Sequence, residues 1–206
     1  MDVRVIGLLI SSDHSTFPSD EYTKLQTSIG RKCSKIIYTA LSEEGFKVNF
    51  TDTIYAITNE LIRIAAHIMF GSELQFSNVQ YHDEKNLCSL TIGIKKCPIC
   101  EYIESRDPVC HLLSGFFGRL IELSFSRFAN IIVDCRENSC IACGDSHCDF
   151  TVKWRVPRGL PSPKKEDVEI RIDEEAFKEK VAELENLDFY KRIVEFARTR
   201  RSVSSS

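Results

Sequence analysis

Apolar residues recur at helical spacing in two long segments of the N-terminal third. They fall every three to four positions between residues 22 and 41, and again between residues 53 and 69. Gly45 and Gly71 follow these stripes and are typical helix stops, and Asp52 is placed to cap the second helix. The pattern predicts two amphipathic helices, each with one face turned towards a core.

Four shorter segments have the alternation or the β-branched and apolar content of strands. Residues 73–81 and 87–94 flank a polar turn, and further strands are expected at residues 130–137 and 148–156. In the last segment polar side chains alternate strictly with apolar ones, which is typical of a strand with one buried face. The chain therefore predicts a sheet that has helices on one side.

A strongly apolar helix is expected between the second and third strands. Asp107 and Pro108 are suited to be its N-cap and first residue. The helix is apolar over a wide arc, so it should be central, and Gly115 and Gly118 would let another backbone approach it closely. Cys110 falls in the first turn, where the positive end of the helix favours a thiolate.

The chain divides into a central domain and terminal segments. We expect a strand or arm at residues 1–19, a domain at 20–156, a proline-containing linker at 157–167, and a charged C-terminal segment at 168–206. The last segment predicts an amphipathic helix that begins at Asp173 and is interrupted near residue 186. Its acidic and basic residues are mixed, which favours a solvated outer face, and the tail after it is expected to be disordered.

Composition excludes some classes of protein. The chain has 206 residues, 43% of them hydrophobic, and a formal net charge of -3, so a sizeable core is possible and nothing in the charge favours nucleic acid binding. No apolar run approaches the roughly 20 residues of a membrane span. The apolar run from Val5 to Ile10 is too short for a secretory signal, so we interpret the protein as cytoplasmic.

Cysteines carry the most specific chemistry in the sequence. Six of the nine fall into two groups, Cys97-Pro-Ile-Cys100 with Cys110, and Cys140, Cys143 and Cys148. In a reducing cytoplasm such clustering favours a metal site or redox chemistry over structural disulfides.

The spacing of these groups suits a metal. Cys97 and Cys100 have the two-residue gap of a zinc knuckle, and Cys140 and Cys148 flank a turn that would bring their sulfurs together. Glu137 could add a carboxylate oxygen. A redox dithiol and ordinary packing remain alternatives for the first pair. Four further residues are expected outside the ligand set, two as core thiols and two as histidines near the clusters: Cys33, Cys88, His111 and His147.

The order of these residues resembles a known family. Asp-Pro-Val-Cys110, a helix with two glycines, Glu137-Asn-Ser-Cys140, and Gly-Asp-Ser-His-Cys148-Asp-Phe150 resemble the 4-vinyl reductase domain over residues 20–156. That domain is related to the Bet-type subunits of the TRAPP vesicle-tethering complex and to the sensory modules of aromatic-responsive bacterial transcription activators. The resemblance implies an α+β fold, an antiparallel sheet with helices packed on it, which usually dimerises through helices.

In the sensory branch the resemblance implies a zinc ion held by four residues. At the matching positions of this sequence they are Cys110, Glu137, Cys140 and Cys148.

The pair formed by Cys97 and Cys100 departs from the family pattern. It could take the place of Cys110 and Glu137 and so complete an all-sulfur site, or it could build a second site with Cys110 and Cys143. Zinc is the favoured metal, and an iron–sulfur cluster is the alternative, because thiolates alone do not distinguish the two.

Three functions are consistent with the sequence. The first is a zinc-binding domain that senses a hydrophobic small molecule and acts through dimerisation and partners. The second is a TRAPP-like trafficking or assembly subunit that takes a lipid or forms a hetero-oligomer. The third, a metal or redox enzyme, is weaker, because the chain has no dinucleotide fingerprint and no nucleophile–base pair that would supply catalytic residues. Five side chains could line an apolar pocket, although each is more typical of a core: Phe70, Phe76, Phe116, Phe117 and Leu120.

Overall fold

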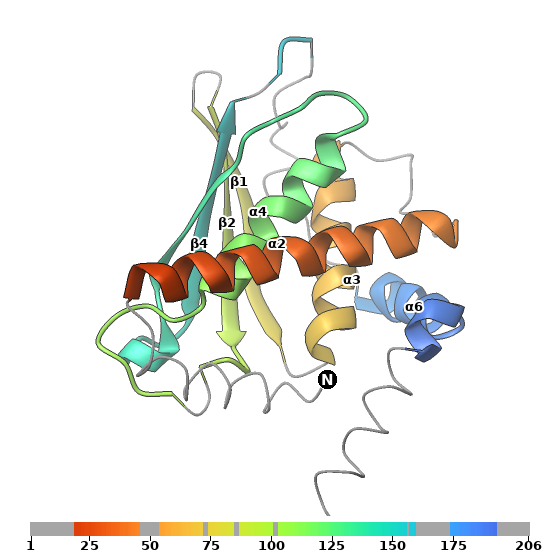
Figure 1. Cartoon of the computed structure of the whole chain (residues 1–206). Coiled ribbons are helices and arrows are strands. Elements are labelled where there is room, and N and C mark those ends of the chain that lie inside the picture. The colour runs from red at the N-terminus through yellow and green to blue at the C-terminus, as the bar shows by residue number, and fades with distance from the viewer. Residues whose placement is uncertain are drawn as a thin grey trace, which may run out of the picture.

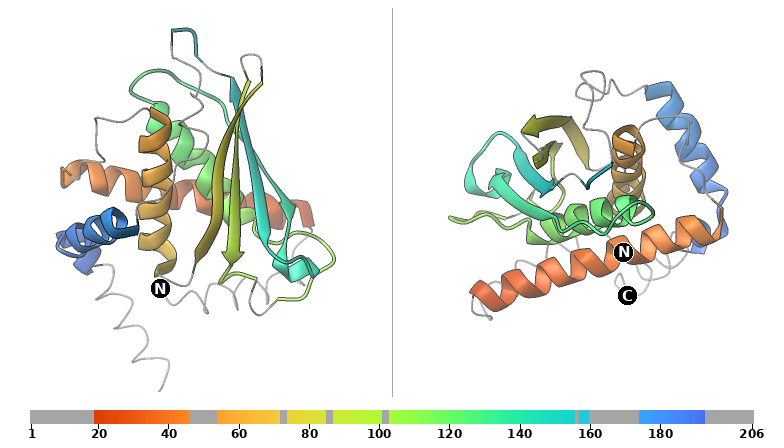
Figure 2. Two further views of the ribbon diagram at one scale, coloured as in Figure 1. Left: turned by 180° about the vertical axis from the view of Figure 1, so that it is seen from behind. Right: turned by 90° about the horizontal axis from the view of Figure 1, so that it is seen from above.

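The computed structural model describes residues 19–45, 54–71, 74–84, 87–100, 103–155, 157–159 and 174–192. They form a four-stranded antiparallel sheet with helices packed on one side, so the expected α+β class is confirmed (Figure 1, Figure 2). The expected N-terminal arm up to residue 18, the cap Asp52, most of the linker and the tail lie outside the described residues.

The elements follow the predicted order, and the strands are arranged β1-β2-β4-β3. No helix in the described part of the chain combines the length and apolar character that a membrane crossing requires. The helices and strands have the following bounds: α2 Ser19–Glu43, α3 Ile54–Phe70, β1 Gln75–Glu84, β2 Leu87–Lys96, α4 His111–Phe125, β3 Asp134–Ser139, the 3-10 turn η2 Ile141–Cys143, β4 Cys148–Arg155 and α6 Glu174–Glu185.

The core lies between the inner face of the sheet and α4. Alternate residues of β2 and β4 are directly paired and buried, so the predicted one-sided pattern of β4 is confirmed. Seen from above, α4 lies between the sheet and α2 (Figure 2). The residue pairs on the inner face are Cys88 with Trp154, Leu90 with Val152, Ile92 with Phe150, and Ile94 with Cys148.

Aromatic side chains fill the space where an apolar pocket was considered. The rings of Phe116 and Phe117 lie 5.6 Å apart, and that of Phe117 lies 5.4 Å from Phe150 on the sheet. Phe70 and Leu120 are also buried, and Phe76 is partly buried against the same core. All five candidate pocket residues are therefore core residues.

Glycines allow α2 and α4 to cross at very close range. A Cβ atom added to Gly115 would lie 2.1 Å from the carbonyl oxygen of Thr27, and one added to Gly30 would lie 2.0 Å from that of Leu112. The predicted close approach at Gly115 is therefore confirmed, and Gly30 is its partner across the crossing. At Gly118 the nearest atom would be a side-chain carbon 3.3 Å away, so that position is less restrictive.

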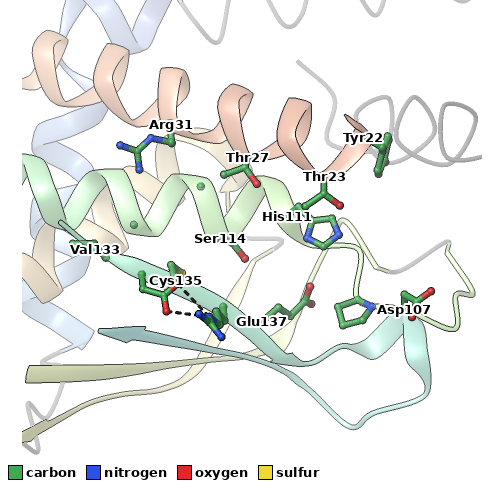
Figure 3. Close-up of a pocket in the computed structure, with 15 residues that line it drawn as sticks. Tyr22, Thr23, Thr27, Arg31, Asp107, His111, Ser114, Val133, Cys135 and Glu137 are labelled. Atoms are coloured by element: carbon green, nitrogen blue, oxygen red, sulfur yellow. Dashed lines mark hydrogen bonds and ion pairs between the residues drawn. The ribbon is translucent and has the colours of Figure 1, made fainter. Parts of the chain in front are cut away.

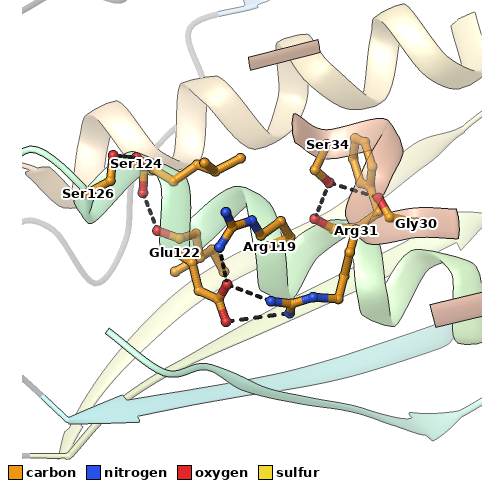
Figure 4. Close-up of polar contacts among 10 residues, drawn as sticks. Gly30, Arg31, Ser34, Arg119, Glu122, Ser124 and Ser126 are labelled. Atoms are coloured by element: carbon orange, nitrogen blue, oxygen red, sulfur yellow. Dashed lines mark hydrogen bonds and ion pairs between the residues drawn. The ribbon is translucent and has the colours of Figure 1, made fainter. Parts of the chain in front are cut away.

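Polar contacts fix the same crossing (Figure 4). The buried Ser34 hydroxyl reaches the Phe116 carbonyl oxygen at 2.6 Å, and Glu122 accepts hydrogen bonds from both Arg31 and Arg119 at 2.8 Å. The Ser34 and Arg31 contacts join α2 to α4, so they hold α2 in a defined position on α4.

The beginning of α4 differs from the prediction. The helix begins at His111 rather than at Asp107 or Pro108, and Cys110 is its N-cap residue. Residues 103–110 are not helical; within them the Asp107 amide donates to the Ser105 hydroxyl at 3.2 Å. The Cys110 amide donates a hydrogen bond to the Glu137 carboxyl group of β3 at 2.9 Å. This bond ties the backbone at Cys110 to the sheet, so the helix begins only after it.

Two strand boundaries also differ. The β1–β2 turn was expected at residues 82–86, but Glu84 pairs with Leu87, so only two residues connect the strands. β3 begins at Asp134 rather than at residue 130, because its pairing with β4 begins at Lys153, near the end of that strand. Before this point Ile132 is 90% exposed.

The C-terminal helix docks on the domain. The guanidinium carbon of Arg63 in α3 lies 4.3 Å from the centre of the Phe177 ring of α6. The centres of the Phe177 and His67 rings are 6.3 Å apart. After α6 the chain leaves the helix at Asn186, as predicted. The Glu44 carboxylate then accepts hydrogen bonds from the amides of Asp188 and Phe189 at 2.9 and 2.8 Å. Residues 193–197 of the predicted helix lie outside the described residues.

Candidate metal centre

Four elements meet at one end of the sheet and bring cysteines together there. β2 ends just before Cys97, α4 begins after its N-cap, η2 begins after Cys140, and β4 begins with Cys148. Each of these five cysteine side chains is at most 3% exposed: Cys97, Cys100, Cys110, Cys140 and Cys148.

A tight turn positions the first pair of thiols. The Cys100 amide donates to the Cys97 carbonyl at 3.1 Å, and the Ile103 amide donates to the Cys100 carbonyl at 3.2 Å. The Ser105 amide then donates to the Ala142 carbonyl at 2.8 Å, which joins this loop to the η2 turn. The two cysteine groups of the sequence are thus linked through their backbones as well as through their side chains.

The turn between β3 and β4 positions the second pair, as the Gly-Asp dipeptide predicted. Gly144 has a left-handed φ of 93°, which permits the sharp reversal after η2. The Asp145 carboxylate accepts the Cys140 amide at 2.7 Å, and the Ile141 amide donates to the Cys148 sulfur at 3.3 Å. The second contact places a backbone dipole where it stabilises a thiolate.

The sulfur separations suit tetrahedral coordination. Cys100 Sγ lies 3.6 Å from the sulfurs of Cys140 and Cys148 and 3.0 Å from that of Cys110. Cys97 Sγ lies 3.6 Å from Cys110 Sγ. Sulfurs bound at about 2.3 Å to one tetrahedral zinc ion are about 3.8 Å apart, so most of these separations are close to those of a zinc–thiolate site.

Glu137 brings a carboxylate to the same cluster. Its Oε2 accepts the Cys110 amide at 2.9 Å, whereas the buried Oε1 has no hydrogen-bond partner among the described residues. Burial, together with the nearby Cys140, raises the pKa of Glu137 to about 9. A buried carboxyl oxygen that faces thiols and lacks a partner fits the requirements of a metal ligand.

Contacts between the thiols shift their pKa values in opposite directions. Contacts with Cys100 and then Cys110 hold the pKa of Cys148 well below its usual range, and contacts with the same two thiols lower the pKa of Cys140 to about 6. The pKa of Cys110 is raised by its bond to Cys100, by its other thiol contacts and by burial. Two of the thiols thus already favour the thiolate form that binds metals.

At least two sets of four ligands can be chosen from this cluster. The ligand atoms of each set lie within 4.8 Å of one another, so the buried cluster can bind a metal ion. Two such sets are Cys97, Cys100, Cys110 and Cys148, and Cys110, Glu137, Cys140 and Cys148.

Cys97 and Cys100 lie in the same cluster as the other candidate ligands. Cys100 Sγ lies 3.6 Å from Cys140 Sγ, and neither of these two sets found among the described residues contains Cys143. The second set matches the four positions implied by the family resemblance. The extra pair therefore lies beside the implied positions.

The remaining candidates belong to neither ligand set. Cys88 is buried as expected, whereas Cys33 is only half-buried on α2. His147 contacts the Ser146 hydroxyl at 2.7 Å and the Asp149 carboxylate at 2.8 Å, and it belongs to neither ligand set. His111 lines a neighbouring cavity.

That cavity of about 750 Å³ lies between α2, the first half of α4 and β3 (Figure 3). Thr27 and Ser114 line it from the helices, and Cys135 and Glu137 line it from β3. Sequence reasoning missed it, because its walls come from three segments far apart in the chain and carry no local signature. Glu137 belongs to both the cavity wall and the second ligand set, so the two sites share a side chain.

Comparisons with known proteins identify the part of the chain that carries the cluster. Residues 90–154 match the V4R domain. This V4R segment runs from the middle of β2 to near the end of β4 and contains all six candidate ligands. The family resemblance expected from the sequence is confirmed.

A curated relative and two solved structures are similar to this chain. Uncharacterized protein MJ0855 of Methanocaldococcus jannaschii is 30% identical over 67 residues, which cover 32% of this chain and 28% of that protein. The phenol-responsive sensory domain of the transcription activator PoxR, solved with phenol, has a TM-score of 0.52 at 13% identity and covers 74% of each chain. A trafficking protein particle complex subunit 3 from Naegleria fowleri, covalently bound to palmitic acid, has a TM-score of 0.53 at 14% identity and covers 78% of this chain and 98% of its own. At these identities the two structures show a shared fold.

Proposed function

We propose that this chain is a ligand-responsive regulatory domain built around a structural zinc centre. The observation that carries the proposal is the position of Glu137, whose carboxyl group lies in the buried thiol cluster and in the wall of the polar cavity. A molecule in the cavity would therefore contact a residue that also reaches the metal.

Zinc suits the donor set better than the other common metals. The cluster offers five buried thiols and one carboxyl group, from which the four ligands of a tetrahedral zinc ion can be drawn, whereas hard cations such as magnesium prefer oxygen ligands. A bound ion would join the start of α4 to the β2 end and the η2 turn. Such a closed site contributes to folding rather than to catalysis.

The cavity favours a ligand with hydrogen-bonding groups. Its walls carry the hydroxyl groups of Thr23, Thr27 and Ser114 together with charged side chains such as Asp134 and Arg136, whereas the apolar interior is filled by aromatic rings. A small aromatic alcohol has both an apolar ring and a hydroxyl group, so phenol is a suitable first probe.

Metal analysis tests the first half of the proposal. The purified chain should contain zinc, and Cys148→Ser, which removes a ligand of both sets, should lower the zinc content, whereas the matched control Cys143→Ser lies outside both ligand sets and should retain it. Full zinc content and unchanged stability in Cys148→Ser would contradict a zinc centre at this site.

Calorimetric titration with phenol tests the second half. Thr27→Trp should fill the cavity and abolish any binding, and Ser28→Trp, on an exposed position of the same helix, should leave it unchanged. Binding that survives Thr27→Trp would place the ligand elsewhere.

A second function, that of an assembly subunit, is favoured by one specific observation. The outer face of α2 exposes three apolar side chains at helical spacing: Leu25 is 45% exposed, Ile29 37% and Ile36 66%. We propose that this stripe, which consists of Leu25, Ile29 and Ile36, packs against a second copy of the chain. Light scattering should show a dimer that dissociates in Ile36→Glu and persists in Lys35→Glu, and a monomeric wild-type chain would exclude this homodimer.

A further inference from the structure

The cysteine cluster offers more ligands than one ion needs. A tetrahedral zinc ion takes four ligands, whereas the cluster supplies five buried thiols and the carboxyl group of Glu137. Some of these candidates must therefore have a role other than coordination. The positions of the sulfur atoms and the hydrogen bonds of the carboxyl group distinguish the two roles.

Cys100 lies against the sulfurs of the set that contains Glu137. Its Sγ is 3.0 Å from that of Cys110 and 3.6 Å from those of Cys140 and Cys148. Thiolates bound to one tetrahedral zinc ion are about 3.8 Å apart, so Cys100 can reach an ion held by these three sulfurs. Cys100 and Glu137 therefore compete for the fourth place beside them.

The thiolate is the stronger competitor for zinc. Zinc favours soft sulfur ligands, and closed structural sites commonly bind it through thiolates alone. The carboxyl group of Glu137, by contrast, already accepts a hydrogen bond from the Cys110 amide through Oε2 at 2.9 Å. This bond holds the carboxyl group on the backbone of a candidate ligand.

We infer that the zinc ion is bound by thiolates only, with Cys100 in place of Glu137, and that Glu137 positions the ligand Cys110. The fourth sulfur beside Cys100, Cys110 and Cys148 comes from Cys97 or Cys140, since either completes a set whose sulfurs lie within 4.8 Å of one another. The inference rests on the proposed zinc centre and identifies its ligands and its link to the cavity.

Glu137 joins the metal centre to the cavity. Its side chain extends from β3 towards α4 and lines the cavity together with Ser114 (Figure 3). Cys110 is the N-cap residue of α4, so the hydrogen bond from its amide ties the start of this helix to the cavity wall. Oε1 has no hydrogen-bond partner among the described residues, which leaves an acceptor for a donor group of a cavity ligand. Such a ligand would act on the ion through Cys110, without displacing a metal ligand.

X-ray absorption at the zinc edge tests the ligand set on the unaltered chain. The inference predicts four sulfurs at about 2.3 Å and no oxygen ligand. Three sulfurs and one oxygen would overturn it and leave the zinc centre intact. A purified chain without zinc would overturn both the inference and the zinc centre.

Two substitutions test the exchange of Glu137 for Cys100. Cys100→Ser should lower the zinc content after gel filtration, whereas Glu137→Gln should retain it, because its side-chain oxygen still accepts the Cys110 amide. The control Cys143→Ser removes a thiol outside the ligand sets and should retain the ion. Loss of zinc from Glu137→Gln, or full content in Cys100→Ser, would overturn the inference. If Cys100→Ser does not fold, the absorption spectrum of the unaltered chain decides.

Glu137→Ala tests the positioning role. Loss of the acceptor should weaken zinc binding about 10–100-fold in competition with a chelator, which is the usual effect of removing a group that orients a ligand. Glu137→Gln should restore the affinity, and both variants should keep four sulfurs around the ion. Equal zinc affinities of the wild type and Glu137→Ala would overturn the positioning of Cys110 by Glu137.

Discussion

The two ends of α4 are equally buried but are held by different chemistry. At the cysteine end, which consists of the N-cap Cys110 and the thiol cluster around it, the contacts are sulfurs, amides and one carboxyl group. At the aromatic end, Phe125 packs against Tyr55 of α3 at 6.1 Å and Trp154 of β4 at 5.7 Å. Apolar packing is stable without any other component, whereas the proposed metal would stabilise the cysteine end, so the two ends should respond to different perturbations.

Metal removal should separate the two ends most strongly. Structural zinc contributes on the order of 10 kcal/mol to small zinc domains, so a strong chelator should lower the free energy of unfolding more than a point substitution does. In hydrogen-exchange measurements, amides of residues 97–110 and 140–148 should lose protection before those around Phe125 do. Equal loss at both ends would contradict a metal confined to the cysteine end.

Phe125→Ala tests the aromatic end. Loss of a fully buried ring should cost about 3–5 kcal/mol in a urea denaturation experiment, through lost burial and the remaining cavity. The zinc content should not change, because the cysteine end keeps its ligands. The control Phe128→Ala removes a ring that is 60% exposed and should cost less than about 1 kcal/mol.

Gly115→Ala tests the crossing with α2. Because the added methyl group would lie 2.1 Å from a backbone oxygen, α2 must shift, at a cost of about 3 kcal/mol measured by thermal or urea unfolding. Gly118→Ala is the matched control, since its added methyl would meet only a side-chain carbon at 3.3 Å. Equal costs in the two variants would mean that the helices are further apart than described.

Acidification should have the smallest effect on stability, and it should act through His67 of α3, whose ring packs against Phe177 of α6. Burial lowers the pKa of His67 despite the opposing charge of Glu185, so the folded state favours the neutral ring. Its stabilising contribution is complete above the unfolded pKa of about 6.5 and is lost as the pH falls towards the folded value. The stability of the wild type should therefore fall more between about pH 7.5 and pH 5 than that of His67→Gln. Parallel pH profiles would show that His67 does not contribute.

Local patterns predicted most elements, because each depends on nearby residues. The alternation in β4 and the helical stripe of α3 both appear where expected, and Gly144-Asp145 forms the predicted turn. The errors lie at boundaries that distant residues decide. α4 begins three residues after Pro108 because Glu137, on another strand, bonds the Cys110 amide.

The sequence by itself determined which residues could bind a metal, because the chemistry of thiols and carboxyl groups belongs to the side chain and the spacing of each short motif is local. It also indicated that Gly115 would lie under a neighbouring backbone. Only the tertiary structure decided that all six candidate ligands lie in one cluster, that two of them belong to both sets, and that Glu137 also faces a cavity. Those facts depend on how β2, α4 and the β3–β4 turn converge. Their convergence is fixed by core packing and by the close contact of α2 with α4 at Gly30 and Gly115, which lie far apart in the chain.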